Sequence, residues 1–239
     1  MRRINHVIAW LAGVGVLVFL IMAPIPQADD VWKTWSLPLT GKTIVIDPGH
    51  GGADGGAVGA GDILEKDIAL NVAKKLKDYL QQAGALVYMT RETDTDLADK
   101  GTQGLSRRKA EDIRNRMAFI KEKEADFFVT IHLNAIPSPQ WSGAQTFYHP
   151  KFDESKHLAT MIQSEITRNL ENTTRTPLAV NTLYLLKHAE VPSTLVEIGF
   201  LSNAQERDQL NQEGYQQQMA GSIYQGILRY VTEDPEEQD

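Results

Sequence analysis

Four side chains of the kinds that bind metals and move protons lie at or near the ends of strand-like segments. His50 follows the apolar run that begins at Thr43, His132 ends a second run, and Glu197 lies inside a third. Glu65 opens the helix-like segment after the glycine-rich stretch around His50. A lone histidine or glutamate in such a place is more often structural, and Glu65 alone would be explained by the helix dipole. The four together predict a functional site.

This set of residues suits a hydrolytic zinc centre. Two imidazoles and one carboxylate are a common ligand set for catalytic zinc, whose fourth position is left to water. His50, Glu65 and His132 fit this set, which leaves Glu197 to take a proton from water and return it to a leaving amine. An unpaired carboxylate in an apolar strand is unfavourable, so Glu197 needs a partner or a role. The spacing leaves open which glutamate is the ligand and which is the base.

Other kinds of ligand are disfavoured. The chain has no cysteine, which excludes disulfides and thiolate zinc sites. Gly49 and Gly51 begin a G-x-G, yet Asp54 stands where the third glycine of a nucleotide-binding motif belongs. A net charge of −7 argues against nucleic acid as a partner. The basic cluster at Ser106–Arg116 is interleaved with acidic residues and is interpreted as a solvated helix face.

Short strand-like segments alternate with helix-like segments along most of the chain. Strands, rich in Val, Ile, Thr and aromatic residues, are predicted at Lys42–Asp47, Ala85–Thr90, Phe127–His132, Ala144–Tyr148, Thr182–Leu186 and Thr194–Ile198. Helices are predicted at Leu64–Gly84, Leu105–Glu124, Asp153–Leu170 and Gly214–Val231, with a short one opened by a capping box at Asn203 and Glu206. The alternation predicts an α/β fold: one three-layer domain with a mostly parallel, twisted sheet of about six strands and helices on both faces.

One catalytic domain, residues 42–232, is expected between shorter segments. Residues 1–26 carry two arginines directly after Met1 and continue with an apolar run that ends before Pro24. The length of this run lies between those of a signal peptide and a membrane helix, and an uncleaved signal anchor is favoured over a cleaved signal peptide. Either would place the domain outside the membrane, because the basic flank stays in the cytoplasm. Residues 27–41 are interpreted as a linker and residues 233–239 as an acidic tail.

Five motifs, in order along the chain, carry a family resemblance: "IVIDPGHGGADGGAVG", "LEKDIALNVA", "MTRETD", "VTIHLNA" and "LVEIGFLSN". They are similar to the zinc-dependent N-acetylmuramoyl-L-alanine amidases of the amidase-3 type, and the resemblance extends from Lys42 to Tyr230. Stretches such as "WSLPL" and "IPSPQWSGAQTFY" resemble the germination-specific, spore-cortex members of that family.

The resemblance implies a metal ligand set, a reaction, a location and partners for this chain. It implies one zinc ion per chain, held by His50, Glu65 and His132, with Glu197 as the catalytic glutamate. The implied reaction cleaves the amide between the lactyl group of N-acetylmuramic acid and L-alanine of the stem peptide, in the peptidoglycan of the spore cortex. A separate deacetylase would then allow closure of the muramic lactam. The implied partners are the glycan strand with its stem peptide and, through the N-terminal segment, the membrane; an accessory protein is an open possibility.

Two other functions are also compatible with these four residues. Another zinc amide hydrolase, such as a peptidoglycan N-deacetylase, would release acetate instead of a peptide. A non-catalytic wall-binding module would keep the fold without turnover, although all four site residues are present.

Asn134, Arg91 and Arg108 are candidates for substrate binding, since the arginines could pair with peptide or muramyl carboxylates. Surface salt bridges are the competing explanation for the arginines.

Overall fold

The computed structural model describes residues 2–22 and 37–233, and the chain divides into two compact units after Ser36. The first unit contains helix α1 (Arg2–Met22), which falls within the predicted signal segment. None of the helices in the described parts of the chain is long and apolar enough to cross a membrane. Most of the predicted linker and all but the first residue of the predicted acidic tail lie outside the described residues. The second unit contains the predicted catalytic domain.

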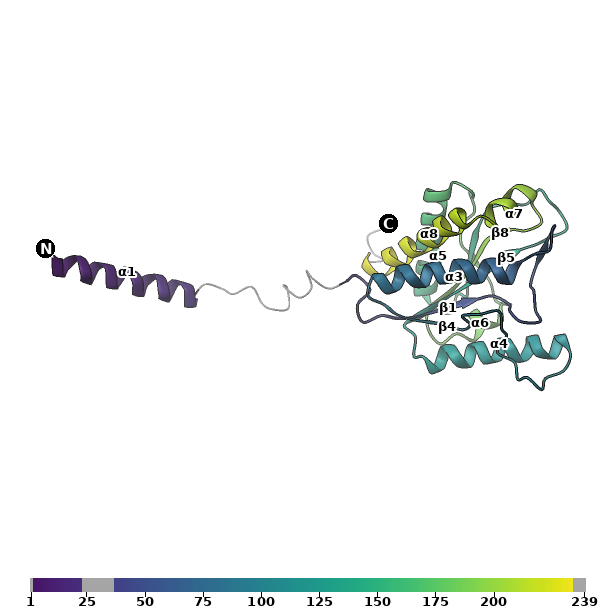
Figure 1. Cartoon of the computed structure of the whole chain (residues 1–239), viewed down its shortest axis with the longest axis horizontal. Helices are drawn as coiled ribbons and strands as arrows, with labels where there is room; N and C mark the ends of the chain where they lie inside the picture. Colours follow the sequence, from purple (N-terminus) through teal and green to yellow (C-terminus); the bar gives the residue numbers. More distant parts are fainter. Residues whose placement is uncertain (1, 23–36, 234–239) are drawn as a thin grey trace. The chain divides into compact units, whose positions relative to one another are not determined.

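The second unit is built on a six-stranded sheet, as the alternating pattern predicts (Figure 1). Its strand order is β4 (Leu86–Met89), β1 (Thr43–Pro48), β5 (Phe127–Asn134), β8 (Ser193–Phe200), β6 (Gln145–Tyr148) and β7 (Leu178–Ala179). All neighbouring strands are parallel except β6 and β8, which are antiparallel. The carboxyl ends of β1, β5 and β8 therefore meet at one edge, the usual place for ligands in such sheets.

Helices cover both faces of this sheet (Figure 1). On one face, α8 (Glu213–Thr232) packs against α3 (Glu65–Gln82) and α5 (Asp153–Leu170). On the other face, α4 (Leu105–Glu122) packs against the short α6 (Tyr184–His188). Each face buries its own cluster of apolar side chains, and the larger cluster lies under α3, α5 and α8. The three-layer arrangement predicted from the sequence is confirmed.

Local sequence signals account for how the helices begin and end. On α3 the side chains of Ile68, Val72, Leu76 and Leu80 are all buried, as their spacing of four residues predicts. Gly84, just beyond this helix, has a φ of +97°, which is strained for any residue with a side chain. The predicted cap of α7 (Ala204–Leu210) is also confirmed, because the Glu206 amide donates to Asn203 Oδ1 at 3.0 Å.

One strand prediction is wrong. The segment Thr182–Leu186 contains the start of α6, and the sixth strand of the sheet is β7 instead. Leu185 and Leu186 are both buried in the smaller apolar cluster, whereas a half-buried strand would bury alternate residues. A short apolar run does not by itself distinguish a strand from a turn of helix. The structure also contains an unpredicted antiparallel pair, β2 (Val58–Gly59) and β3 (Ile63–Leu64), in the loop before α3.

Candidate metal centre

His50 lies in the loop that leaves the carboxyl end of β1. Its φ of 60° is in the left-handed region, which is uncommon for a residue with a side chain. This backbone turns the imidazole back toward the sheet edge, where its ring centroid lies 5.0 Å from that of His132 on β5. Gly49 makes the approach possible, because a Cβ at that position would lie 2.4 Å from the His132 ring. The glycine-rich sequence is therefore required by the packing of the site.

Glu65, the first residue of α3, joins the two histidines. Its side chain is only 3% exposed, with Oε2 3.2 Å from His50 Nε2 and Oε1 2.9 Å from His132 Nδ1. The backbone amides of Ala57 and Leu133 donate to the same carboxylate, at 2.7 and 2.9 Å. Burial opposes its ionisation, but the hydrogen bonds and charges of His132 and His50 outweigh burial and hold the pKa of Glu65 well below its usual range.

The three side chains form a group with the chemistry of a metal site. One ligand atom from each of His50, Glu65 and His132 lies within 4.8 Å of the others. Two imidazole nitrogens and a carboxylate oxygen match the three protein ligands of a catalytic zinc site. Asp54 lies 2.8 Å from His50 Nδ1, and Lys109 lies 2.7 Å from the other oxygen of Asp54. This contact orients the ring and directs Nε2 toward the group.

Glu197 lies beside this group. It is paired with His132 in the register between β5 and β8. Its Oε2 is buried and makes no hydrogen bond to the described residues. Burial, together with the nearby charge of Glu65, raises the pKa of Glu197 to about 7, although both histidines act in the opposite direction. A carboxyl group that titrates near neutral pH can both accept and return a proton.

A cavity of about 230 Å³ opens next to the histidines. Its lining includes His50 and His132 together with Lys109 and two apolar side chains, Ile113 and Leu185. The walls thus come from the β1 loop, β5, α4 and α6, which lie far apart in the sequence. This space lets a ligand reach the group of three side chains from the α4 side of the sheet.

The three residues predicted to bind substrate have different positions. Asn134 ends β5, is half-buried, and accepts the Leu201 amide on its backbone carbonyl. Arg91 is 4% exposed, and its guanidinium donates to backbone carbonyls, including that of Gly49 at 2.8 Å. Arg108 pairs with Asp96 on the long loop before α4. Arg91 thus lies beneath the loop that contains His50. Contact of Asn134, Arg91 and Arg108 with substrate stays a prediction.

The sequence interpretation missed a buried network beneath the loop of His50. Arg116 is 3% exposed and donates to Asp47 at 2.8 Å, to Asp112 at 2.9 Å and to the carbonyl of Pro48 at 2.7 Å. It also donates to the carbonyl of His50. The prediction of a solvated helix face for 106–116 is therefore wrong at Asp112 and Arg116. The i, i+4 spacing of this pair was visible, but burial of one helix end was not.

Together the fold and the site define a candidate metallohydrolase, an α/β domain with two histidines and a glutamate beside a free carboxyl group. The chain belongs to the N-acetylmuramoyl-L-alanine amidase family Amidase_3, whose model matches residues 44–229. The chain is accordingly an N-acetylmuramoyl-L-alanine amidase, an enzyme that acts on peptidoglycan. The family resemblance seen in the five motifs is confirmed.

Three individual amidases resemble this chain over most of its length. The chain is 53% identical to the germination-specific N-acetylmuramoyl-L-alanine amidase of Bacillus subtilis, over 99% of this chain and 100% of the relative. It is 34% identical to the amidase LytC of the same organism, over 89% of this chain but 40% of LytC. Among solved structures, it resembles the CwlD amidase of Clostridioides difficile, solved in complex with the GerS lipoprotein. That match has a TM-score of 0.79 at 39% identity and covers 81% of this chain and 100% of CwlD.

Proposed function

We propose that this enzyme hydrolyses the amide between the lactyl group of N-acetylmuramic acid and L-alanine with one zinc ion, held by His50, Glu65 and His132, and with Glu197 as general base. The observation that carries the proposal is the buried Oε2 of Glu197, which has no hydrogen-bond partner in the described part of the chain and lies beside three side chains whose ligand atoms are within 4.8 Å of one another. A zinc ion in this site would supply Lewis acidity, which lowers the pKa of water from about 16 to about 7 and polarises an amide carbonyl.

In this proposal, residues of the chain transfer the proton and orient a metal ligand. Glu197 takes a proton from the attacking water and then delivers it to the leaving amine of L-alanine, which makes that amine a better leaving group. Glu65 is less suited to act as the base, because both of its oxygens already accept backbone amides and its low pKa makes it a weak proton acceptor. Asp54 and Lys109 hold the ring of His50 in one orientation.

We further infer that the substrate is the peptidoglycan of the spore cortex. The support is the identity to a relative named as germination-specific over the full length of both chains. In that setting a separate deacetylase would act on the exposed amino sugar and allow lactam closure. Export with residues 1–26 as signal anchor, and hence attachment to the membrane, belong to the same proposal. The similarity to an amidase solved with a lipoprotein supports an accessory protein for this chain as well.

The test is digestion of defined peptidoglycan by the full-length chain, with zinc and with a chelator, followed by mass spectrometry. Cortex and vegetative peptidoglycan are compared side by side. Zinc-dependent release of intact stem peptides with a new L-alanine amino terminus, faster from cortex, is the expected result. Release of acetate would instead assign an N-deacetylase, and equal rates with and without chelator would contradict the zinc proposal. Equal rates on the two substrates would remove the cortex assignment alone.

A further inference from the structure

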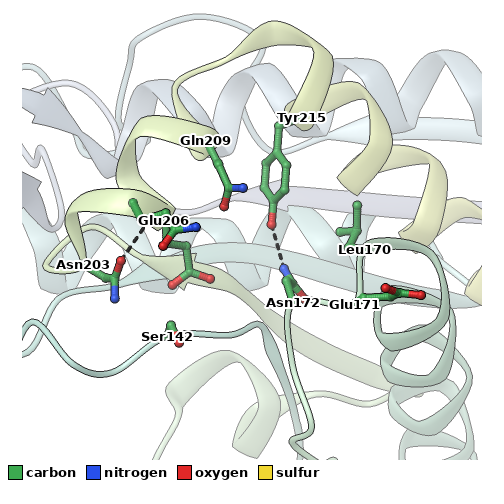
Figure 2. A pocket seen from close by; sticks show the side chains of 9 residues that line it. Ser142, Leu170, Glu171, Asn172, Asn203, Glu206, Gln209 and Tyr215 are labelled. Carbon is green, nitrogen blue, oxygen red and sulfur yellow. Dashed lines mark hydrogen bonds between the residues drawn. The ribbon is translucent and has the colours of Figure 1, made fainter.

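A second, polar hollow lies on the β6 side of the metal centre. Two cavities of about 270 and 500 Å³ share the side chains of Ser142, Glu171 and Asn172, so they form one groove. Figure 2 shows the first of them, with Gln209 and Tyr215 reaching from α7 and α8 toward Asn172 and Ser142 on the facing loops. The second cavity continues past Trp141. We call the joined cavities the Trp141 groove.

The lining of the Trp141 groove suits a neutral ligand that offers many hydrogen-bonding groups. Most of the side chains around it are amides and hydroxyls. Two of its three charged side chains are engaged by the fold: Glu206 accepts the backbone amides of Gly143 and Phe200, and Arg175 donates to Ser142 and Gln145, while Glu171 lies exposed at the rim. A ligand would therefore meet donors and acceptors without meeting an unpaired cation.

Trp141 adds a flat apolar surface to this polar groove. Its side chain is 47% exposed, and the Arg175 guanidinium lies 5.5 Å from the ring centroid. The same guanidinium lies 5.3 Å from the Phe200 ring, so the indole is held against the body of the domain. A single exposed apolar residue needs no explanation by itself. A restrained indole beside amide and hydroxyl groups, however, offers the two contacts that a pyranose ring needs, namely stacking and hydrogen bonds.

The groove walls are fixed by close packing of two loops. Gly143 has a φ of +93°, and a Cβ there would lie 2.9 Å from the carbonyl oxygen of Asn172. Asn172 in turn donates to the Tyr215 hydroxyl at 2.7 Å, which ties the loop to α8. The groove is thus a built part of the fold, and little rearrangement would be needed for a ligand to bind.

The sheet connects the Trp141 groove to the candidate active site. Gln145 on β6 is paired with Glu197 on β8, and Arg175 donates to the Gln145 side chain at 3.3 Å. Phe200 follows Glu197 by three residues on the same strand, which is about 10 Å of extended chain. A polymer with its reacting amide beside Glu197 therefore has the Trp141 groove within reach of its neighbouring units.

We propose that the Trp141 groove binds N-acetylated sugars of the glycan strand next to the muramic acid whose amide is cleaved. The inference rests on the proposed function for the identity of the polymer. The stem peptide is the rival ligand, but it carries carboxylates, and the groove presents the exposed Glu171 at its rim. Like charges at that position disfavour the peptide.

The decisive experiment measures sugar binding without any cleavage. Trp10, Trp32 and Trp35 are replaced by Phe in the full-length chain, which leaves Trp141 as its one tryptophan. The probe is chitotetraose, a β-1,4-linked N-acetylglucosamine tetramer that lacks the lactyl amide. Saturable change of Trp141 fluorescence is expected, and calorimetry with Trp141→Ala in the otherwise unchanged chain should show Kd raised roughly tenfold or more. The Gln82→Ala variant, changed at an exposed position outside the groove, should bind like the parent.

Two other results of the binding experiment would contradict the inference. If chitotetraose produces no saturable response, or if a free stem peptide does so in its place, the inference is overturned. Activity supplies a second readout: Trp141→Ala should raise KM on long glycan strands more than on a single muramoyl peptide, whereas Gln82→Ala should leave both KM values unchanged. Equal KM values on long strands would also contradict the inference. Should the parent chain cleave nothing, the proposed function fails, while the binding measurement still decides the groove.

Discussion

At the scale of single residues, the two glutamates of the site occupy opposite electrostatic surroundings. Glu65 is buried but accepts two backbone amides and faces two imidazoles, so its pKa is lowered. Glu197 is half-buried, its buried Oε2 has no hydrogen-bond partner among the described residues, and its pKa rises to about 7. Carboxyl groups whose environments drive their pKa values apart commonly take different roles in catalysis. The contrast supports Glu65 as ligand and Glu197 as base, a choice that the sequence spacing had left open.

The first prediction separates these roles by mutation. Glu197→Gln should keep the zinc ion, because it leaves the three ligands untouched, and should lower kcat by about 10²- to 10⁴-fold, the usual contribution of a general acid or base. Zinc content per chain and kcat on a muramoyl peptide are measured together. The matched control is Glu190→Gln, at an exposed position paired with Lys121, which should behave like the parent. Loss of zinc from Glu197→Gln but not from Glu65→Gln would reverse the assignment.

The second prediction concerns the carboxylate behind His50. Asp54→Asn should weaken zinc binding by about 10- to 100-fold, because the ring of His50 loses the charged acceptor that orients it. Competition with a chromogenic chelator gives the zinc affinity directly, without reference to activity. Asp62→Asn, an exposed change in the same loop region, is the control and should leave affinity unchanged. An unchanged affinity in Asp54→Asn would show that packing alone holds the imidazole.

At the scale of elements, the loop after β1 is held from two sides by buried arginines. Arg91 donates to the carbonyls of Pro48 and Gly49, and Arg116 donates to those of Pro48 and His50. These bonds hold His50 in its left-handed backbone conformation, which is unfavourable for a residue with a side chain. Asp47 at the end of β1 compensates the charge of Arg116. The geometry of the proposed metal site therefore depends on this network as well as on His50, Glu65 and His132 themselves.

The third prediction uses the pH dependence of that network. Burial opposes ionisation of Asp47, but the charge of Arg116 and hydrogen bonds from Thr90 and Thr130 lower its pKa. A lowered pKa contributes stability that is present above the unfolded value, about 3.9, and is lost as the pH falls through the folded value. Asp47→Asn should thus reduce the free energy of unfolding by about 3 kcal/mol at pH 7, and the gap to the parent should narrow below pH ~4.

Urea unfolding at pH 7, 5, 4 and 3 measures this gap. Asp78→Asn, on the exposed face of α3, is the control and should follow the parent at every pH. A gap that stays constant from pH 7 to pH 3 would mean that Asp47 contributes through packing and not through its charge.

Much of this architecture was predictable because it depends on local patterns. Regular spacing of buried residues located α3, and Asn203 with Glu206 located the start of α7. The zinc ligand candidates followed from residue type, with His50 and His132 at strand ends and Glu65 at the start of a helix. Arg116 was not predictable as a buried residue, because its burial depends on Asp47, 69 positions earlier in the chain. Likewise, α6 was mistaken for a strand because its two buried leucines pack against α4 and β8, which are distant in the sequence.

At the scale of the whole domain, parallel pairing brings distant residues together. The register of β5 and β8 places His132 opposite Glu197, and β1 on the other side of β5 delivers the loop of His50. Glu65 comes from the helix that follows this loop. A metal ion bound by these ligands would link the β1 loop, α3 and β5. Zinc binding and stability of the second unit should therefore be coupled, since a ligand of the folded state shifts the unfolding equilibrium.

The fourth prediction follows from this coupling. Free zinc at 100 times its Kd should add about 2.7 kcal/mol to the free energy of unfolding, which raises Tm by roughly 5 to 10 °C for a domain of this size. Calorimetry of the full-length chain with zinc and with chelator measures the shift. Glu197→Gln should retain it, and His132→Ala should lose it. His149→Ala, which removes an imidazole from the loop after β6, should retain it. A shift that persists in His132→Ala would place the stabilising zinc ion elsewhere, since one of the three proposed ligands would be missing.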